Sequence, residues 1–287
     1  MVFAAAAALP AIAVAKDPEP EVLKRNGQWV IDHDRDRCHL TAQFGSGDGS
    51  VLARFSRYQP GDGFDFSIFG NRLKINGRPQ ALLDFGLPGA PVETQGFRTG
   101  SLGELPAIFF GEERLDGWPR KGEWPLKEGE TAPPVTPDME AAVHSATVSI
   151  KHKPTFRLEF GSMREPFELM RHCMTTLVES WGYDPKVQAT LSRPLKPVGE
   201  PANWLLSSDF PTGTLNNGAS GSVRFRLDVD AAGNVARCNA LSRPSPDSFA
   251  DIVCRALSRR AKYEPARDAQ GRPVASFIMQ NVWNSGG

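Results

Sequence analysis

The 287 residues carry no net charge, because 33 lysines and arginines balance 33 aspartates and glutamates. This balance argues against a nucleic-acid-binding protein and against a protein held on an anionic membrane by a polybasic surface. Hydrophobic residues make up 40% and charged residues 23% of the chain, which is ordinary for soluble globular proteins, and the length leaves room for two domains that each bury a core.

Residues 1–15 form an apolar, alanine-rich stretch. Two overlapping triplets, Ala11-Ile12-Ala13 and Ala13-Val14-Ala15, fit a small-x-small cleavage site, so the stretch is typical of a secretory signal peptide. A truncated membrane anchor is the alternative, although Pro10 interrupts the stretch, which is also shorter than the ~20 residues that span a bilayer. The basic residues that usually open a signal peptide are missing, which favours a true start upstream of Met1. We therefore expect an exported protein.

The region 22–183 is predicted to be a strand-rich α+β domain with one long C-terminal helix. The helix is predicted to begin at the capping-box pattern Ser162–Glu165 and to end at Gly182. Its apolar stripe contains Phe167, Met170, Cys173, Met174, Leu177 and Trp181. The strand-like segments before it are 28–32, 38–44, 51–58, 64–69, a short strand and turn at 73–78, 81–85, 107–110, 146–151 and 155–160.

A proline-rich segment at 184–201 is predicted to be a linker, and 202–287 a second, smaller domain. In this domain Val223, Phe225, Leu227 and Val229 alternate with polar residues, which is typical of a half-buried strand. A turn at 230–233, a second strand at 234–241, a helix after Ser245-Pro246 and a last strand at 274–283 follow. The expected order is therefore β-β-α-β.

Several short motifs of this second domain occur together in a characteristic order. They are Asp209-Phe210-Pro211, Gly221-Ser222-Val223-Arg224-Phe225, Asp230-Ala231-Ala232-Gly233-Asn234-Val235, an arginine-rich helix, Tyr263-Glu264-Pro265-Ala266-Arg267-Asp268 and Gly271-Arg272-Pro273-Val274. Over roughly Leu205 to Trp283 the chain resembles the C-terminal domain of TonB-type energy transducers. It departs from the family pattern early in the helix, where Phe249-Ala250 stands in place of Leu-Asp.

The resemblance implies a periplasmic protein whose edge strand pairs with a segment of a TonB-dependent outer-membrane receptor or another periplasmic protein, by β-augmentation. Transferred by position, the pairing strand is 274–283. The partner-binding residues are then Ser276, Phe277, Ile278, Met279, Gln280, Asn281 and Val282. The alternatives are that this strand only completes its own sheet, or that it pairs with a second copy of the chain in a homodimer.

The four cysteines are Cys38, Cys173, Cys238 and Cys254, and four cysteines allow three disulfide pairings. The simplest pairing places one disulfide in each domain, Cys38–Cys173 and Cys238–Cys254. Metal binding is the alternative, but the chain has no CxxC spacing. We expect no metal and no cofactor.

No catalytic motif is evident. The chain lacks a Gly-x-Ser-x-Gly nucleophile elbow, and the calcium-loop-like sequence that begins at Asp228 has Ala232 and Asn239 at ligand positions. We therefore predict a non-enzymatic protein of TonB-dependent transport. The alternatives are a soluble exported binding module without energy transduction, and an exported enzyme with its site in the N-terminal domain.

Overall fold

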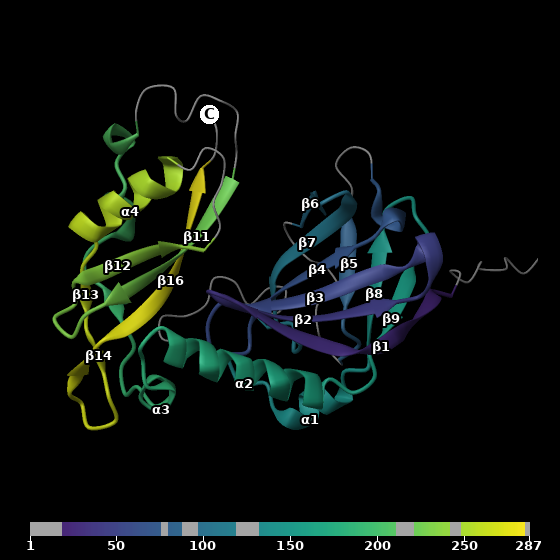
Figure 1. Cartoon of the computed structure of the whole chain (residues 1–287), viewed down its shortest axis with the longest axis horizontal. Helices are drawn as coiled ribbons and strands as arrows, with labels where there is room; N and C mark the ends of the chain where they lie inside the picture. Colours follow the sequence, from purple (N-terminus) through teal and green to yellow (C-terminus); the bar gives the residue numbers. More distant parts are fainter. Residues whose placement is uncertain are drawn as a thin grey trace, which may run out of the picture.

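The computed structural model describes residues 19–75, 80–87, 97–118, 132–210, 221–241 and 248–284. The described residues form two hydrophobic cores, one built by the N-terminal part of the chain and one by the C-terminal part. In Figure 1 the N-terminal domain, on the right, is a large sheet with a long helix below it, and the C-terminal domain is a small sheet covered by helix α4. The α+β prediction is confirmed.

The N-terminal domain contains one nine-stranded sheet with the order β5-β8-β9-β1-β2-β3-β4-β7-β6. Strand β1 pairs antiparallel with β2 and parallel with β9. The strands are β1 (Glu21–Asp34), β2 (Arg37–Phe44), β3 (Val51–Arg57), β4 (Phe64–Phe69), β5 (Ala81–Asp84), β6 (Arg98–Leu102), β7 (Leu105–Glu113), β8 (Ser145–Ile150) and β9 (Phe156–Glu159). The 3-10 turn η1 (Gly47–Gly49) lies between β2 and β3, and η2 (Asn71–Leu73) lies between β4 and β5. The predicted strand at 73–78 is wrong at its start, because Leu73 ends η2 and residues 74–75 form no strand, while 76–79 lie outside the described residues.

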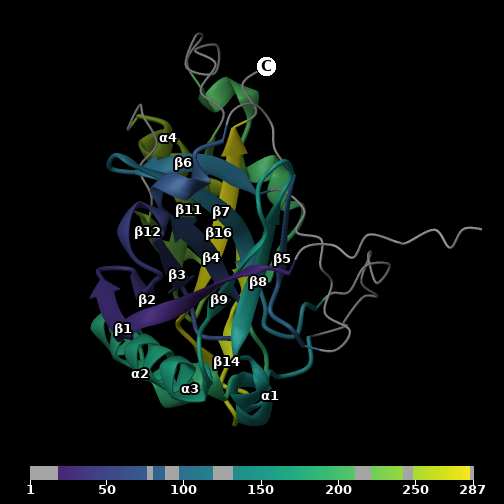
Figure 2. The same ribbon diagram turned by 90° about the vertical axis from the view of Figure 1, so that its right-hand side faces the viewer.

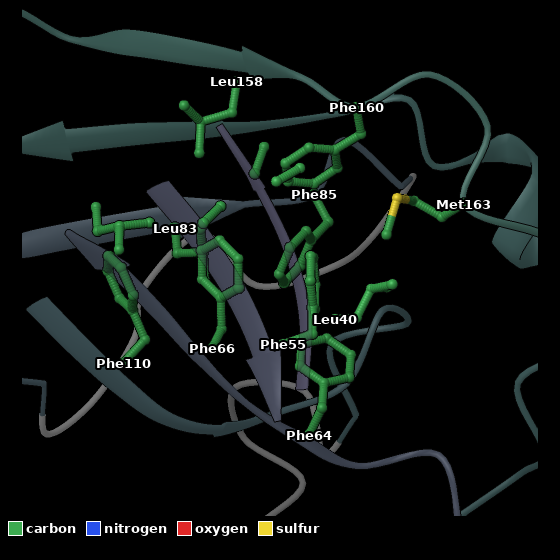
Figure 3. Close-up of a cluster of buried hydrophobic side chains, with 14 of the residues drawn as sticks. Leu40, Phe55, Phe64, Phe66, Leu83, Phe85, Phe110, Leu158, Phe160 and Met163 are labelled. Atoms are coloured by element: carbon green, nitrogen blue, oxygen red, sulfur yellow. The ribbon is translucent and has the colours of Figure 1, made fainter. Parts of the chain in front are cut away.

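The core of this domain is rich in phenylalanine, and Figure 3 shows its central side chains converging between the strands. Phe55 is fully buried, and its ring packs edge-on against Phe64, Phe160 and Phe167 at centroid distances of 5.0–5.7 Å. Edge-to-face contacts of this kind add to the stabilisation that burial of the rings provides. The apolar residues that alternate along these strands lie on the face of the sheet that packs into this core.

Helix α2 (Arg164–Ser180) covers the sheet with the predicted apolar stripe, and the short helix α1 (Pro137–Ala142) lies beside it. The predicted capping box is wrong, because Met163 is the N-cap and its side chain makes no capping hydrogen bond, while the Ser162 hydroxyl accepts only a long bond, 3.5 Å, from the N–H of Arg164. Met163 is fully buried in the core, and its carbonyl accepts the N–H of Phe167 at 3.0 Å. Met163 therefore joins the start of the helix to the core of the domain.

Both predicted disulfides are confirmed. Cys38 on β2 is bonded to Cys173 on α2, and Cys238 is bonded to Cys254. The described part of the chain contains no cluster of histidine, cysteine, aspartate or glutamate side chains that could hold a metal ion. It also contains no helix with the length and apolarity needed to cross a membrane.

The C-terminal domain contains a three-stranded antiparallel sheet with the order β12-β11-β16. Its elements are β11 (Gly221–Val229), β12 (Val235–Ala240), α4 (Ser248–Arg260), β13 (Tyr263–Glu264), β14 (Ala266–Arg267), β15 (Pro273–Val274) and β16 (Ser276–Asn284). The predicted β-β-α-β order is confirmed, with three short strands added between the helix and the last strand. The predicted helix cap at Ser245-Pro246 lies outside the described residues.

The segment predicted as a linker contains secondary structure of its own. Helix α3 (Pro185–Ala189) is capped by Asp184, and β10 (Lys196–Pro197) pairs with β13 of the C-terminal domain. The turns η3 (Pro201–Trp204) and η4 (Ser207–Asp209) follow. The boundaries at 183 and 201 stay predictions.

The turn between β11 and β12 requires a glycine at position 233. Gly233 has φ of +85°, and a Cβ built on it would collide with the carbonyl oxygen of Tyr263. We expect Gly233→Ala to lower the free energy of unfolding by about 2 kcal/mol or more, because the positive φ alone costs a side chain about 1–2 kcal/mol. Gly271→Ala is the matched control, since Gly271 has φ of +77° in open space. Equal urea midpoints for the two variants would contradict the proposed collision.

Candidate partner-binding edge and domain interface

The predicted partner-binding residues of β16 are divided between the two faces of the sheet. Ile278 and Val282 pack against the core beneath α4, while Phe277 and Met279 pack against the core of the N-terminal domain. Both faces of the strand are therefore occupied. Figure 2 shows the N-terminal sheet in front and β16 running behind it. Only the main-chain groups along the outer edge of β16 could therefore bind a partner strand.

The register shows which main-chain groups of β16 point outward. The N–H of Leu241 donates to the carbonyl of Arg224 at 2.8 Å, so the main chain of Arg224 faces β12. Because main-chain direction alternates along a strand, Phe225 faces β16, where its register partner is Gln280. Gln280 and its alternate neighbours therefore bond to β11. The residues between them direct N–H and C=O to the outer edge: Phe277, Met279 and Asn281. No described strand pairs with this edge.

The centre of the domain interface is the buried side chain of Arg226, on the face of β11 opposite α4. Its guanidinium contacts Asp36 of the N-terminal domain at 2.6 Å and Asp228 at 3.0 Å. It also lies over the ring of Trp181, 4.1 Å from the centroid. Arg226 is 6% exposed and Asp228 is 2% exposed. A buried cation with two carboxylates and an aromatic ring connects the two domains here.

Aromatic packing continues the interface onto β16. The ring of Phe277 lies between Trp181 and Tyr183, with centroid distances of 5.0 and 5.2 Å. The hydroxyl of Tyr183 donates to the carbonyl of Ser276 at 3.1 Å. Burial, reinforced by nearby Asp228, raises the pKa of Tyr183 well above its ordinary value, so the hydroxyl stays a donor. Phe277 thereby holds the start of β16 against the end of α2.

A second ion pair lies next to a groove between the domains. Arg224 on β11 contacts Asp65 on β4 at 2.9 Å, and its guanidinium lies 4.2 Å from the ring centroid of Tyr58. The groove, of about 240 Å³, has the loop 58–63 and Glu112 on one side and Arg224, Met279 and Asn281 on the other. We call it the interdomain groove. It adjoins the outer edge of β16 at Met279 and Asn281.

The comparison with known families assigns the C-terminal domain. Residues 207–283 match the family model of the Gram-negative bacterial TonB protein C-terminal. The chain contains a TonB C-terminal domain. Domains of this family transduce or bind rather than catalyse, and they interact with outer-membrane receptors and other proteins. The match includes β11, β12, α4 and β16, and the N-terminal sheet lies outside it. No curated protein and no solved structure matches the chain.

Helix α3 is hydrogen-bonded to the TonB C-terminal domain just before and at the start of its last strand. The side-chain amide of Gln188 donates to the carbonyl of Ala275 at 3.1 Å, and the hydroxyl of Ser276 donates to the Gln188 side-chain oxygen at 2.6 Å. Ser276 is 3% exposed as a result. Among the predicted partner-binding residues, Ser276 therefore belongs to the internal packing of the domain.

Sequence reasoning did not identify the interface of the TonB C-terminal domain. It treated β11 as half-buried, whereas Arg226 and Asp228 are buried, like Leu227 between them. The signal was present, because charged residues of both signs alternate with apolar ones at the centre of this strand. Their partners Asp36 and Asp65 are far away in the sequence, so no local pattern connects them.

Proposed function

We propose that this protein binds an extended segment of an outer-membrane receptor of TonB-dependent transport, by adding that segment to the outer edge of β16. The observation that carries the proposal is the set of main-chain groups of Phe277, Met279 and Asn281, which face outward on a TonB C-terminal domain. An added strand would bond to these groups without disturbing either packed face of the sheet. Main-chain hydrogen bonds then supply the affinity.

The two edges of the sheet differ in a way that supports β16 over β12. Strand β12 has six residues, its register with β11 shifts between Asp228 and Val229, and its Arg237 is exposed. Short length, irregular pairing and charge are features that protect an edge from further pairing. Strand β16 pairs with β11 over nine consecutive positions without a shift. It is therefore the more regular template for an added strand.

A periplasmic location is part of this proposal, and it is supported by the family of the C-terminal domain together with the signal-like sequence at 1–15, which lies outside the described residues. The second candidate is an exported binding module that uses the same edge without transmitting energy. It is favoured by the direct packing of a folded, disulfide-bonded N-terminal domain on the TonB C-terminal domain.

Proline at position 281 tests the outer edge. Asn281→Pro removes one outward N–H and places the ring where a partner strand would lie, while the bonds of β16 to β11 remain. We expect at least about tenfold weaker binding, the equivalent of one lost hydrogen bond of roughly 1.4 kcal/mol. Fluorescein-labelled peptides from the N-terminal segments of the outer-membrane receptors of the same cell would be titrated with the full chain.

Asn281→Ala is the matched control for this titration, because it removes the side chain that accepts from Arg224 at 3.1 Å and keeps the N–H. Binding that is weakened equally by both variants, or by neither, would exclude the β16 edge. A wild-type protein that sediments as a dimer, and that Asn281→Pro converts to a monomer, would instead support the homodimer hypothesis.

A further inference from the structure

The interdomain groove lies where side chains of an added strand would project. Side chains along a strand alternate between the faces of its sheet, so half of those on a segment paired with β16 would point to the face that carries Phe277, Met279 and Asn281. The N-terminal domain covers this face. Next to Met279 and Asn281, however, the contact between the domains opens into the groove. Side chains of the segment can enter there.

Two carboxylates stand side by side in this groove. Asp65 on β4 and Glu112 on β7 are directly opposite each other in the ladder, and like charges in that position destabilise a sheet unless a cation lies between them. Arg224 bonds both oxygens of Asp65, at 2.9 and 3.3 Å. Among the described residues Glu112 has no ion pair. The other described cation that lines the groove is Arg57, which is buried and donates to the carbonyl of Asp62 at 3.4 Å. Neither described arginine of the groove therefore pairs with Glu112.

The backbone leaves room for the Glu112 carboxylate beside the loop. A Cβ built on Gly63 would lie 2.9 Å from Oε1 of Glu112, so a side chain at position 63 would displace the carboxylate. The third acid of the groove is already engaged, because Asp62 contacts Arg114 at 3.5 Å and accepts the N–H of Val135 at 2.9 Å. Glu112 is therefore the acid that remains available to an incoming cation.

We propose that the interdomain groove accepts a lysine or arginine side chain of the segment paired with β16, and that Glu112 is its counter-ion. The N-terminal domain then determines which segments bind, while β16 supplies the main-chain affinity. This inference rests on the proposed function and adds to it the chemical class of the partner: an extended segment with a basic residue on the side that faces the N-terminal domain.

A charge scan of the bound peptide tests the inference. Each position of the peptide that binds best is changed to lysine and, separately, to glutamine, and each peptide is titrated with the full chain at low salt. We expect lysine at one position, or at two positions two residues apart, to strengthen binding about fivefold over glutamine, the upper range for a solvent-accessible ion pair. This preference should disappear in Glu112→Gln, which should bind the glutamine peptides as the wild type does.

Glu104→Gln is the control, because Glu104 is exposed in the same domain and does not line the groove. It should keep the lysine preference. A lysine preference that is absent, or that survives Glu112→Gln, overturns the inference even when Asn281→Pro abolishes binding. Insensitivity of binding to Asn281→Pro would instead contradict the proposed function itself, so the two failures are distinguishable.

Discussion

Arg226→Ala is expected to lower the free energy of unfolding by about 3–5 kcal/mol and to loosen the contact between the two domains. The guanidinium is buried between Asp36, Asp228 and Trp181, so its removal leaves Asp36 without its cation and leaves Asp228 with only the exposed Arg237, in a site from which water is largely excluded. Breaking a buried pair from one side is costly because the remaining charge stays desolvated.

Urea unfolding of the full chain measures the loss of stability, and hydrogen exchange of β11 and β16 shows whether the interface opens. Arg237→Ala is the matched control, because Arg237 contacts the same Asp228 at 3.0 Å but is 65% exposed, so a cost of about 1 kcal/mol or less is expected. Arg226→Ala combined with Asp228→Asn should recover part of the loss. Equal destabilisation by the two arginine variants would show that Arg226 does not connect the domains.

Removing the Cys38–Cys173 disulfide is expected to have an effect of similar or larger size. The bond closes a loop with a sequence separation of 135, for which the chain-entropy model gives about 5 kcal/mol. The Cys238–Cys254 bond has a separation of 16, for which the same model gives about 3 kcal/mol. Alanine pairs at the two sites should therefore destabilise the protein to different extents.

The location of the effect matters as much as its size. In the Cys38→Ala/Cys173→Ala variant, urea-dependent hydrogen exchange should accelerate first in β2 and α2, the elements that the bond joins. The Cys238→Ala/Cys254→Ala variant is the control, and its exchange should accelerate in β12 and α4 instead. A greater loss of stability in the second variant would contradict the loop-length argument.

Local patterns predicted most elements of this fold and both disulfides. Alternation identified β3, β4 and β11, and the apolar stripe of α2 is buried as expected. The start of α2 was predicted incorrectly, because the N-cap is the core residue Met163 and not Ser162 of the capping pattern. Tertiary packing decides such competitions, and a single sequence does not display it.

The candidate site was predictable only in part. The resemblance indicated the last strand, but the distinction between outward-facing Asn281 and inward-facing Gln280 depends on the register with β11. The interdomain groove depends on Asp65 and Glu112, which are paired in the N-terminal sheet, and on Arg224, which meets them only when the two domains pack together. Contacts over such separations leave no periodic trace in the sequence.

The connection between β16 and the N-terminal domain has a mechanical consequence. A pull on β16 would reach the N-terminal domain through Phe277, which contacts Trp181 at the end of α2. It would also reach it through the paired strand β11, whose Arg226 contacts Asp36 in the turn before β2. These two attachment points lie close along the chain to Cys173 and Cys38, the two ends of one covalent bond. Tension therefore arrives at both ends of the same cross-link, and the two elements that carry it cannot be drawn apart. The N-terminal domain would resist such a load as a single body.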